Sequence, residues 1–309
     1  MGVSRISGYP EYGPGSNINY IPEIYSGKLV EKFYKTTVFG EIASTDYEGE
    51  ISAYGSIVHI RTVPDITISD YVIGQGLPNQ YPSSASVSLT INRAKSFAVA
   101  LSTVDARESD IDMADVFAND ASIQLRIVAD ADVLVTIPAQ VSVDNQGSTA
   151  GVDSNSINIG DSTNPVVITP TNVVNFIVDC GTVLDEQNVP DDGRWLVAPP
   201  WFMGTIKKSD LRIASLAGDG VSILRNGKVG EVDRFTLYQS RQLLSQTSPG
   251  PANYVMFGHS AGLTFAAQIL ENEMITNPND FGYIIRGLMV YGFQTINGNY
   301  LGTAVVARG

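Results

Sequence analysis

One run of the chain constrains its fold more than any other, because residues 109–137 contain neither glycine nor proline. Ser109 is followed three residues later by Asp112, a spacing that resembles a capping box at a helix N-terminus. We therefore predict one long helix of roughly 35 to 45 Å at 1.5 Å per residue, longer than the mean globular helix. Its β-branched end, Val133 to Ile137, favours a change to strand.

The acidic residues at the start of this predicted helix have a structural explanation. Asp110, Asp112 and Asp115 fall in its first turns, where the helix dipole favours negative charge. We therefore do not interpret them as a catalytic pair.

A strand pattern precedes the helix. Residues 55–101 alternate between apolar and polar side chains, with a break at Pro64-Asp65 and an irregular Gly/Pro/Ser loop, GQGLPNQYPSSAS, between the two halves. The second half alternates as Val87, Leu89, Ile91 and then Phe97, Val99, Leu101. Such a ribbon is marginal alone, so another surface must cover it, and a second copy of the chain is a natural candidate.

The remaining segments predict an extended arm, a surface loop, and short helices and strands. Residues 1–20 are rich in Gly, Pro, Tyr, Ser and Asn and predict an extended arm, followed by an amphipathic helix over 22–34. Residues 144–164 predict a surface loop. Further predictions are a helix that starts at Thr169-Pro170 with Val173, Ile177, Cys180 and Leu184 buried, a buried strand before Pro199-Pro200, a helix over 203–217, a hairpin turn at Asn226-Gly227, and two closing strands.

Composition excludes several classes of protein. One cysteine and two histidines permit no disulfide framework and no Cys/His zinc site, and no cofactor is predicted. No stretch is apolar for long enough to span a bilayer, and the first residues lack the apolar region of a signal peptide, so we expect a soluble protein. The net charge of −13 is concentrated in residues 105–192, which carry 16 acidic and 2 basic side chains. An acidic middle disfavours a dedicated nucleic-acid binder. Its charges either attract the basic last third between copies or form solvated faces.

One motif suggests an enzyme. Gly258-His259-Ser260-Ala261-Gly262 fits the G-x-S-x-G nucleophile elbow, with a short apolar run before it and a helical spacing over 263–274 after it. The catalytic triad of an α/β-hydrolase needs a histidine that follows the serine in the chain, and no histidine follows Ser260. The other histidine, His59, lies on the predicted ribbon, where we expect it to be partly exposed. We interpret Ser260 as the cap of a packing helix.

The other chemical signals are weaker. The segment SILRNGKV lacks the first glycine and the Ser/Thr of a P-loop, and DSNSINIGD has Ile157 and Asn164 where a calcium loop needs ligands. Cys180 is expected in the core. The acid pairs Asp185/Glu186 and Asp191/Asp192 are expected to be solvated, without a base beside them. The sequence therefore predicts no catalytic, cofactor or metal residue.

The order of these elements resembles the major capsid proteins of tailed bacteriophages, the Hong Kong 97-like shell fold. Five stretches are similar to those proteins in family order: FGEIASTDYEGEISAYGSIVHI with SDYVIGQ, LTINRAKSFAVALSTVDARESDID, VPDDGRWLVAPPWF, NGKVGEVDRFTLYQS and FGYIIRGLMVYGFQTI. The resemblance implies an α+β fold with four parts. These are an N-terminal arm (1–45), an extended β-loop (46–103), a peripheral domain with a long spine helix (104–145 and 286–309), and an axial domain (146–285).

The resemblance also implies a function. It predicts a non-enzymatic subunit that assembles with itself into the hexamers and pentamers of an icosahedral phage head around double-stranded DNA, in the host cytoplasm. Scaffolding and portal proteins, and a decoration protein, are the implied partners. The implied inward position of the acidic helix would repel packaged DNA. We predict neither a cleaved scaffolding segment nor Lys-Asn crosslinks. The shell of a cellular encapsulin compartment is the alternative, and a hydrolase that uses Ser260 is the distant one.

Overall fold

The computed structural model describes residues 37–46, 57–61, 64, 66–71, 73–74, 76, 79–83, 86–103, 113–209, 230–248, 250–278 and 280–309. The first 36 residues of the predicted N-terminal arm (1–45), including its helix over 22–34, lie outside these residues, as do the capping box at Ser109 and the turn at Asn226-Gly227.

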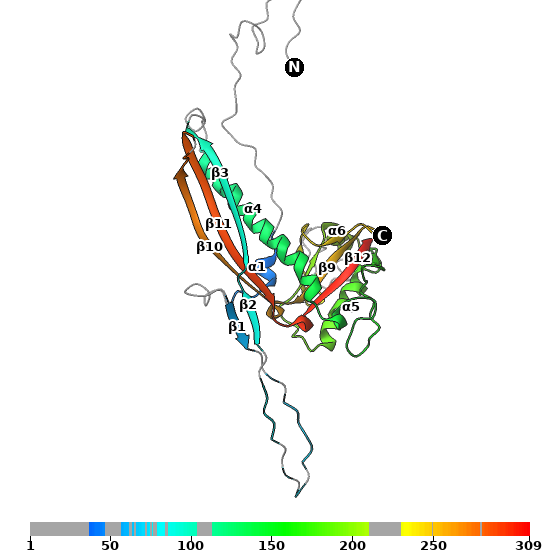
Figure 1. Ribbon diagram of the computed structural model, residues 1–309. Coiled ribbons are helices and arrows are strands. Elements are labelled where there is room, and N and C mark those ends of the chain that lie inside the picture. Colours follow the sequence, from blue (N-terminus) through cyan, green and yellow to red (C-terminus); the bar gives the residue numbers. More distant parts are fainter. Residues whose placement is uncertain are drawn as a thin grey trace, which may run out of the picture.

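A long helix lies along a long sheet (Figure 1). The helix α4 runs over Met113–Thr136 and continues into a 3-10 turn over Ile137–Gln140. The predicted long helix is therefore confirmed over these residues, but the change to strand at its end is wrong. Val133 and Leu134 are fully buried there, and this packing outweighs the β propensity of Val133.

The long sheet has three antiparallel strands in the order β10-β11-β3. They span Leu263–Thr276 (β10), Gly282–Thr295 (β11) and Arg93–Ser102 (β3). The face of β3 that includes Phe97, Val99 and Leu101 is less exposed than the opposite face, as the alternation predicted.

The predicted helix over 263–274 is wrong, because this segment is strand β10. Its residues have good helix propensity, but it pairs with β11 from Leu263↔Thr295 to Thr276↔Tyr283, with one irregularity between Ile269 and Glu271. This continuous ladder outweighs the local preference. The Ser260 prediction fails with it: Ser260–Gly262 is a single 3-10 turn between two strands, capped by His259.

A second, mixed sheet forms the compact part of the molecule, with strand order β4-β12-β9-β5-β7-β6 and β8 paired to β9. This part of the molecule also contains two helices, α5 (Val173–Glu186) and α6 (Pro200–Lys208). The strands span Val166–Ile168 (β4), Arg194–Ala198 (β5), Glu231–Val232 (β6), Phe235–Gln239 (β7), Ser245–Gln246 (β8), Ala252–His259 (β9) and Leu301–Arg308 (β12).

Both faces of this sheet are covered, which explains why every residue of β5 is buried. Leu196 and Ala198 face a core built with α5 and α6. Trp195 and Val197 face a second core that includes the end of α4 and the base of the long sheet. The second core therefore joins the two sheets. The buried strand predicted before Pro199-Pro200 is confirmed.

The start of α5 differs from the prediction by three residues. Thr169-Pro170 belongs to a turn, and the helix begins at Val173, because the side chain of Asn172 accepts from the N–H of Thr169 and donates to the carbonyl of Val167. Its predicted buried stripe is confirmed, since Val173, Ile177, Cys180 and Leu184 are all fully buried.

The helix predicted over 203–217 starts earlier, at Pro200, where proline fits the first helical position. It ends at Lys208, and residues 210–217 lie outside the described part of the chain. The hairpin that is described turns at Asp233 and Arg234, whose φ angles of 47° and 66° are typical of a type I′ turn between β6 and β7.

A short ribbon projects from the junction of the two sheets (Figure 1). It consists of β1 (Ile57–Arg61) and β2 (Ser86–Thr90), paired antiparallel. Ile60 and Leu89 bury one face of its base against Ala266 of β10.

A short segment crosses the junction. It contains helix α1 (Phe39–Ile42), which packs against α4 and β10. After it, Ser44 forms a parallel bridge to Thr264 at the start of β10.

Candidate interaction surfaces

The serine motif has none of the geometry of a nucleophile elbow. Ser260 lies in a strand-to-strand turn, where an elbow needs a strand followed by a helix. Nδ1 of His259 accepts a hydrogen bond from the backbone N–H of Ala261 at 3.1 Å, so this nitrogen serves the turn. His59 is exposed on β1, and its Nδ1 lies 2.9 Å from the hydroxyl of Ser88. Nothing in this arrangement activates the serine.

The lone cysteine is part of the core. Cys180 is fully buried in α5, and burial, together with the negative charges of Asp179 and Asp233, raises the pKa of its thiol well above the usual value. The thiol is therefore protonated at neutral pH and a poor nucleophile.

The acid pairs are not simply solvated, because two arginines bind Asp185 and Asp191. The guanidinium of Arg194 is completely buried and contacts a carboxylate oxygen of Asp185 at 2.7 Å and one of Asp191 at 3.1 Å. Arg234 binds the same two carboxylates from the surface, at 2.9 and 2.6 Å. Burial alone would raise the pKa of Asp185, but the hydrogen bonds from the two arginines hold it below its ordinary value.

This ion network is structural. The buried guanidinium of Arg194 also donates to the carbonyls of Pro190 and Val189, at 2.8 and 2.6 Å, and so fixes the loop between α5 and β5. The sequence did not identify it, because the two arginines are 40 positions apart and only the parallel pairing of β5 with β7 brings them together.

The described residues contain neither a metal centre nor a membrane span. Within them, His, Cys, Asp and Glu side chains never gather in threes at a distance suited to one metal ion. In the same part of the chain, every helix is too short or too polar to cross a bilayer.

One exposed apolar surface lies beyond the β1–β2 ribbon. Ile68 and Ile73 are 88% and 90% exposed, and Tyr81 is 90% exposed. The two arms of this loop approach each other at Thr67 and Gln80, where the Gln80 amide both accepts from and donates to the Thr67 backbone, at 3.0 and 2.5 Å. A loop that exposes several large apolar side chains is typical of a surface that another protein covers.

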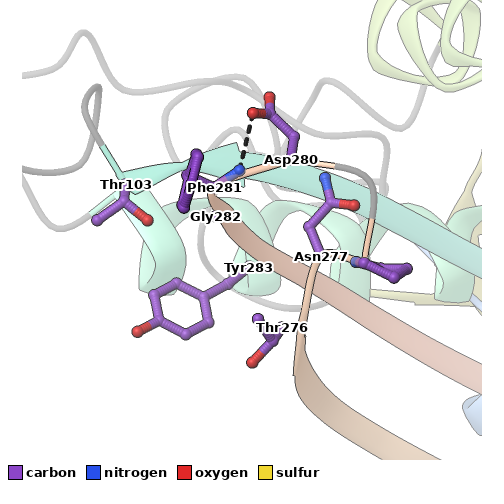
Figure 2. A pocket seen from close by; sticks show the side chains of 8 residues that line it. Thr103, Thr276, Asn277, Asp280, Phe281, Gly282 and Tyr283 are labelled. Carbon is purple, nitrogen blue, oxygen red and sulfur yellow. Dashed lines mark hydrogen bonds between the residues drawn. The ribbon is translucent and has the colours of Figure 1, made fainter.

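A second candidate surface lies at the far end of the long sheet, where β10 turns into β11 (Figure 2). A hollow of about 470 Å³ is lined there by residues from both strands and by Thr103 at the end of β3. Phe281 is 87% exposed at this tip, and its backbone N–H donates to the carboxylate of Asp280 at 2.7 Å. The sequence reasoning missed this tip, although the turn-forming residues NPND mark it.

Comparison with known proteins identifies the architecture. No protein-family model and no curated protein matches the sequence. The chain is similar to a solved structure from Mycobacterium phage Che8, with 23% identity, 92% of this chain and 97% of that chain covered, and a TM-score of 0.74. The capsid structure of cyanophage P-SCSP1u is similar over 94% of both chains, with 15% identity and a TM-score of 0.71.

The asymmetric unit of the mature capsid of bacteriophage PhiM1 agrees over 99% of this chain and 96% of that chain, with 15% identity and a TM-score of 0.66. The chain has the fold of phage capsid proteins. The predicted α+β capsid fold is therefore confirmed, and it covers nearly the whole length of both partners in each comparison.

Within this capsid fold, the two sheets suggest boundaries other than the predicted ones. The axial domain was predicted over 146–285, but β10 belongs to the long sheet that packs on α4. The peripheral domain was predicted to include 286–309, but β12 lies inside the seven-stranded sheet. The chain crosses from the second sheet to the long sheet after β9 and returns before β12.

Proposed function

We propose that the chain is the major capsid protein of a tailed phage, a structural subunit without catalytic residues. In this proposal its copies assemble into the hexamers and pentamers of an icosahedral head that encloses double-stranded DNA. The observation that carries the proposal is the agreement in fold with phage capsid structures over more than nine tenths of each chain. The protein would assemble in the host cytoplasm and end in the virion.

The projecting loop supports self-assembly. Its apolar side chains have no partner surface within the described part of the chain and are too exposed to stabilise a monomer. Covering them with a neighbouring subunit would bury apolar area at about 25 cal/mol per Å². The same loop on every copy gives each subunit one such contact to make and one to receive, as a closed shell requires.

We assign the four parts of a capsid subunit to this chain with adjusted boundaries. We propose that the N-terminal arm covers residues 1–45 and that the extended loop includes the strands β1 and β2. The spine helix α4 with the long sheet forms the peripheral domain. The seven-stranded sheet with α5 and α6 forms the axial domain, around which subunits meet. Scaffolding and portal proteins, and a decoration protein, are the proposed further partners.

Electron microscopy of the purified full-length protein tests the proposal. We expect uniform icosahedral shells. Shells that contain a cargo enzyme and no DNA when purified from the native source would favour the encapsulin alternative. A small monomer with esterase activity that Ser260→Ala abolishes would overturn both.

A double variant tests the role of the loop. Ile68→Ser with Ile73→Ser should leave the melting temperature of the subunit unchanged, because both side chains are almost fully exposed, and should reduce shell formation. Val143→Ser is the matched control, since Val143 is 79% exposed but lies in the turn after α4. Assembly of the double variant at the level of the control would contradict the proposed contact.

A further inference from the structure

A carboxyl group inside the molecule joins three segments that are distant in sequence. Asp130 of α4 is completely buried. Its Oδ1 accepts hydrogen bonds from the backbone N–H groups of Val38 and Phe39, both at 2.9 Å, and its Oδ2 lies 2.6 Å from the side-chain amide of Gln242. Asp130 therefore holds the segment 37–46 against α4 and against the connection between β7 and β8.

No positive charge compensates this carboxyl among the described residues. Asp132 of the same helix, by contrast, faces Arg93 and Lys95 of β3. Burial raises the pKa of Asp130 above its ordinary value, and the three hydrogen bonds lower it without cancelling that effect. The nearest charged or titratable residues on the elements packed around Asp130 are Glu41 on α1, Arg126 and Asp132 on α4, Tyr238 on β7, and Arg241 before Gln242. None of them makes a hydrogen bond or ion pair with Asp130 in the described structure.

The contact with Gln242 fits a protonated carboxyl. The other amide atom of Gln242, Oε1, is buried and has no hydrogen-bond partner. The oxygen and nitrogen of an amide exchange places when it turns by half a rotation. In that orientation Oε1 accepts the proton of Asp130, while Oδ1 still accepts from Val38 and Phe39.

We propose that Asp130 is a proton-operated latch. The segment 37–46 docks most tightly on α4 when Asp130 carries a proton and donates it to Gln242, and the docking loosens as the carboxyl ionises. The physical reason is that docking removes Asp130 from water, which penalises its charged form. Docking and proton binding therefore favour each other.

The direction of the pH dependence follows from this linkage. A carboxyl whose pKa is raised by docking binds its proton more tightly in the docked state. The contribution of the proton to docking is therefore fully present below the ordinary pKa of an aspartate and is lost as the pH rises through the raised value. The inference does not depend on the proposed capsid function.

Hydrogen exchange of the full-length protein tests the latch. Protection factors of the amides of Val38 and Phe39, corrected for intrinsic exchange, are measured between about pH 4 and pH 8. We expect protection in the wild type to fall with rising pH, by at most about tenfold per pH unit for one proton. Asp130→Asn keeps a neutral acceptor and a donor for Gln242, and we expect its protection to stay high at every pH.

Asp132→Asn is the matched control on the same helix, and we expect it to keep the pH dependence of the wild type. Protection that is constant or rises with pH in the wild type would overturn the proposal. So would lower protection in Asp130→Asn than in the wild type near pH 7, because the ionised carboxylate would then be the anchor. Should Asp130→Asn fail to fold, Gln242→Met decides: loss of the proton acceptor should move the fall in protection to lower pH, and an unmoved curve would refute the latch.

Discussion

The buried guanidinium of Arg194 allows the sharpest test of how the compact part of the molecule is held together. Replacing it by methionine keeps most of the apolar stem and removes all of its donors. The loss leaves the carboxylates of Asp185 and Asp191 without their buried partner and the carbonyls of Val189 and Pro190 without their donors. Asp185 and Asp191 are 41% and 66% exposed and stay hydrated, whereas the buried carbonyl of Val189 loses its donor, which costs about 1 to 3 kcal/mol. We therefore expect Arg194→Met to lower the free energy of unfolding by about 1 to 3 kcal/mol.

Arg234→Met is the matched control, because Arg234 binds the same two carboxylates but its side chain is 38% exposed. Water screens such a pair, and its removal should cost only about 0 to 1 kcal/mol. Urea unfolding followed by tryptophan fluorescence measures both variants. The two tryptophans of the chain are Trp195, next to Arg194 on β5, and Trp201 on α6, so the signal reports on this part of the molecule.

The comparison of these two variants can refute the structural role of Arg194. If Arg194→Met and Arg234→Met lower the free energy of unfolding equally, the buried donors contribute no more than the exposed ones, and the structural role assigned to Arg194 is refuted. Arg194→Lys adds a further check, since it keeps the charge but has lost the planar fork, and we expect it to retain less than half of the stabilisation.

Two further predictions concern packing and pH. Gly302→Ala would place a Cβ atom 2.2 Å from a ring carbon of Phe257, so we expect the free energy of unfolding, measured by thermal unfolding, to fall by about 1 to 3 kcal/mol. The control is Gly204→Ala in α6, which should not be destabilising because nothing lies within 4 Å of the added Cβ atom. Equal effects of the two substitutions would contradict this account. The lowered pKa of Asp185 contributes stability above the ordinary aspartate pKa that is lost as the pH falls through the lowered value. Acid unfolding should therefore be less steep in Asp185→Asn than in the wild type, and identical acid transitions would count against the network.

Sequence reasoning succeeded where one local pattern and the final packing agree. The stripe of α5 and the buried strand β5 combine a regular spacing with complete burial in the structure. The alternation of Phe97, Val99 and Leu101 on β3 is of the same kind, because the sheet has one covered and one open face.

Sequence reasoning failed where contacts between segments that are distant in sequence decide the structure. Residues 263–274 have helical spacing and helix-forming side chains, and only the ladder with β11 makes them a strand. The end of α4 was read as a strand because of Val133 and Val135, but contacts with two sheets keep it helical. The anchor at Asp130 had no sequence signal, since its partners lie 92 and 112 residues away.

The charge distribution is the feature whose meaning the structure changes most. The acidic middle of the sequence suggested either attraction between copies or solvated faces. In the structure, part of it is satisfied within the chain: Asp132 faces Arg93 and Lys95, and Asp185 and Asp191 bind Arg194 and Arg234. These basic residues come from the parts of the sequence before and after the acidic region, so folding brings together opposite charges that are separated in the sequence.

The predicted repulsion between α4 and packaged DNA therefore depends on few aspartates. Of the four aspartates in the described helix, Asp130 is buried, Asp120 is half-buried and Asp132 faces Lys95, while Asp115 is exposed to solvent. We expect Asp115→Lys to reduce the DNA content of filled particles, if the helix faces the genome. Asp132→Lys is unsuitable for this test, because it would place a third positive charge beside Arg93 and Lys95. Filled particles of Asp115→Lys with the DNA content of the wild type would show that the charge at this end of α4 does not act on the genome.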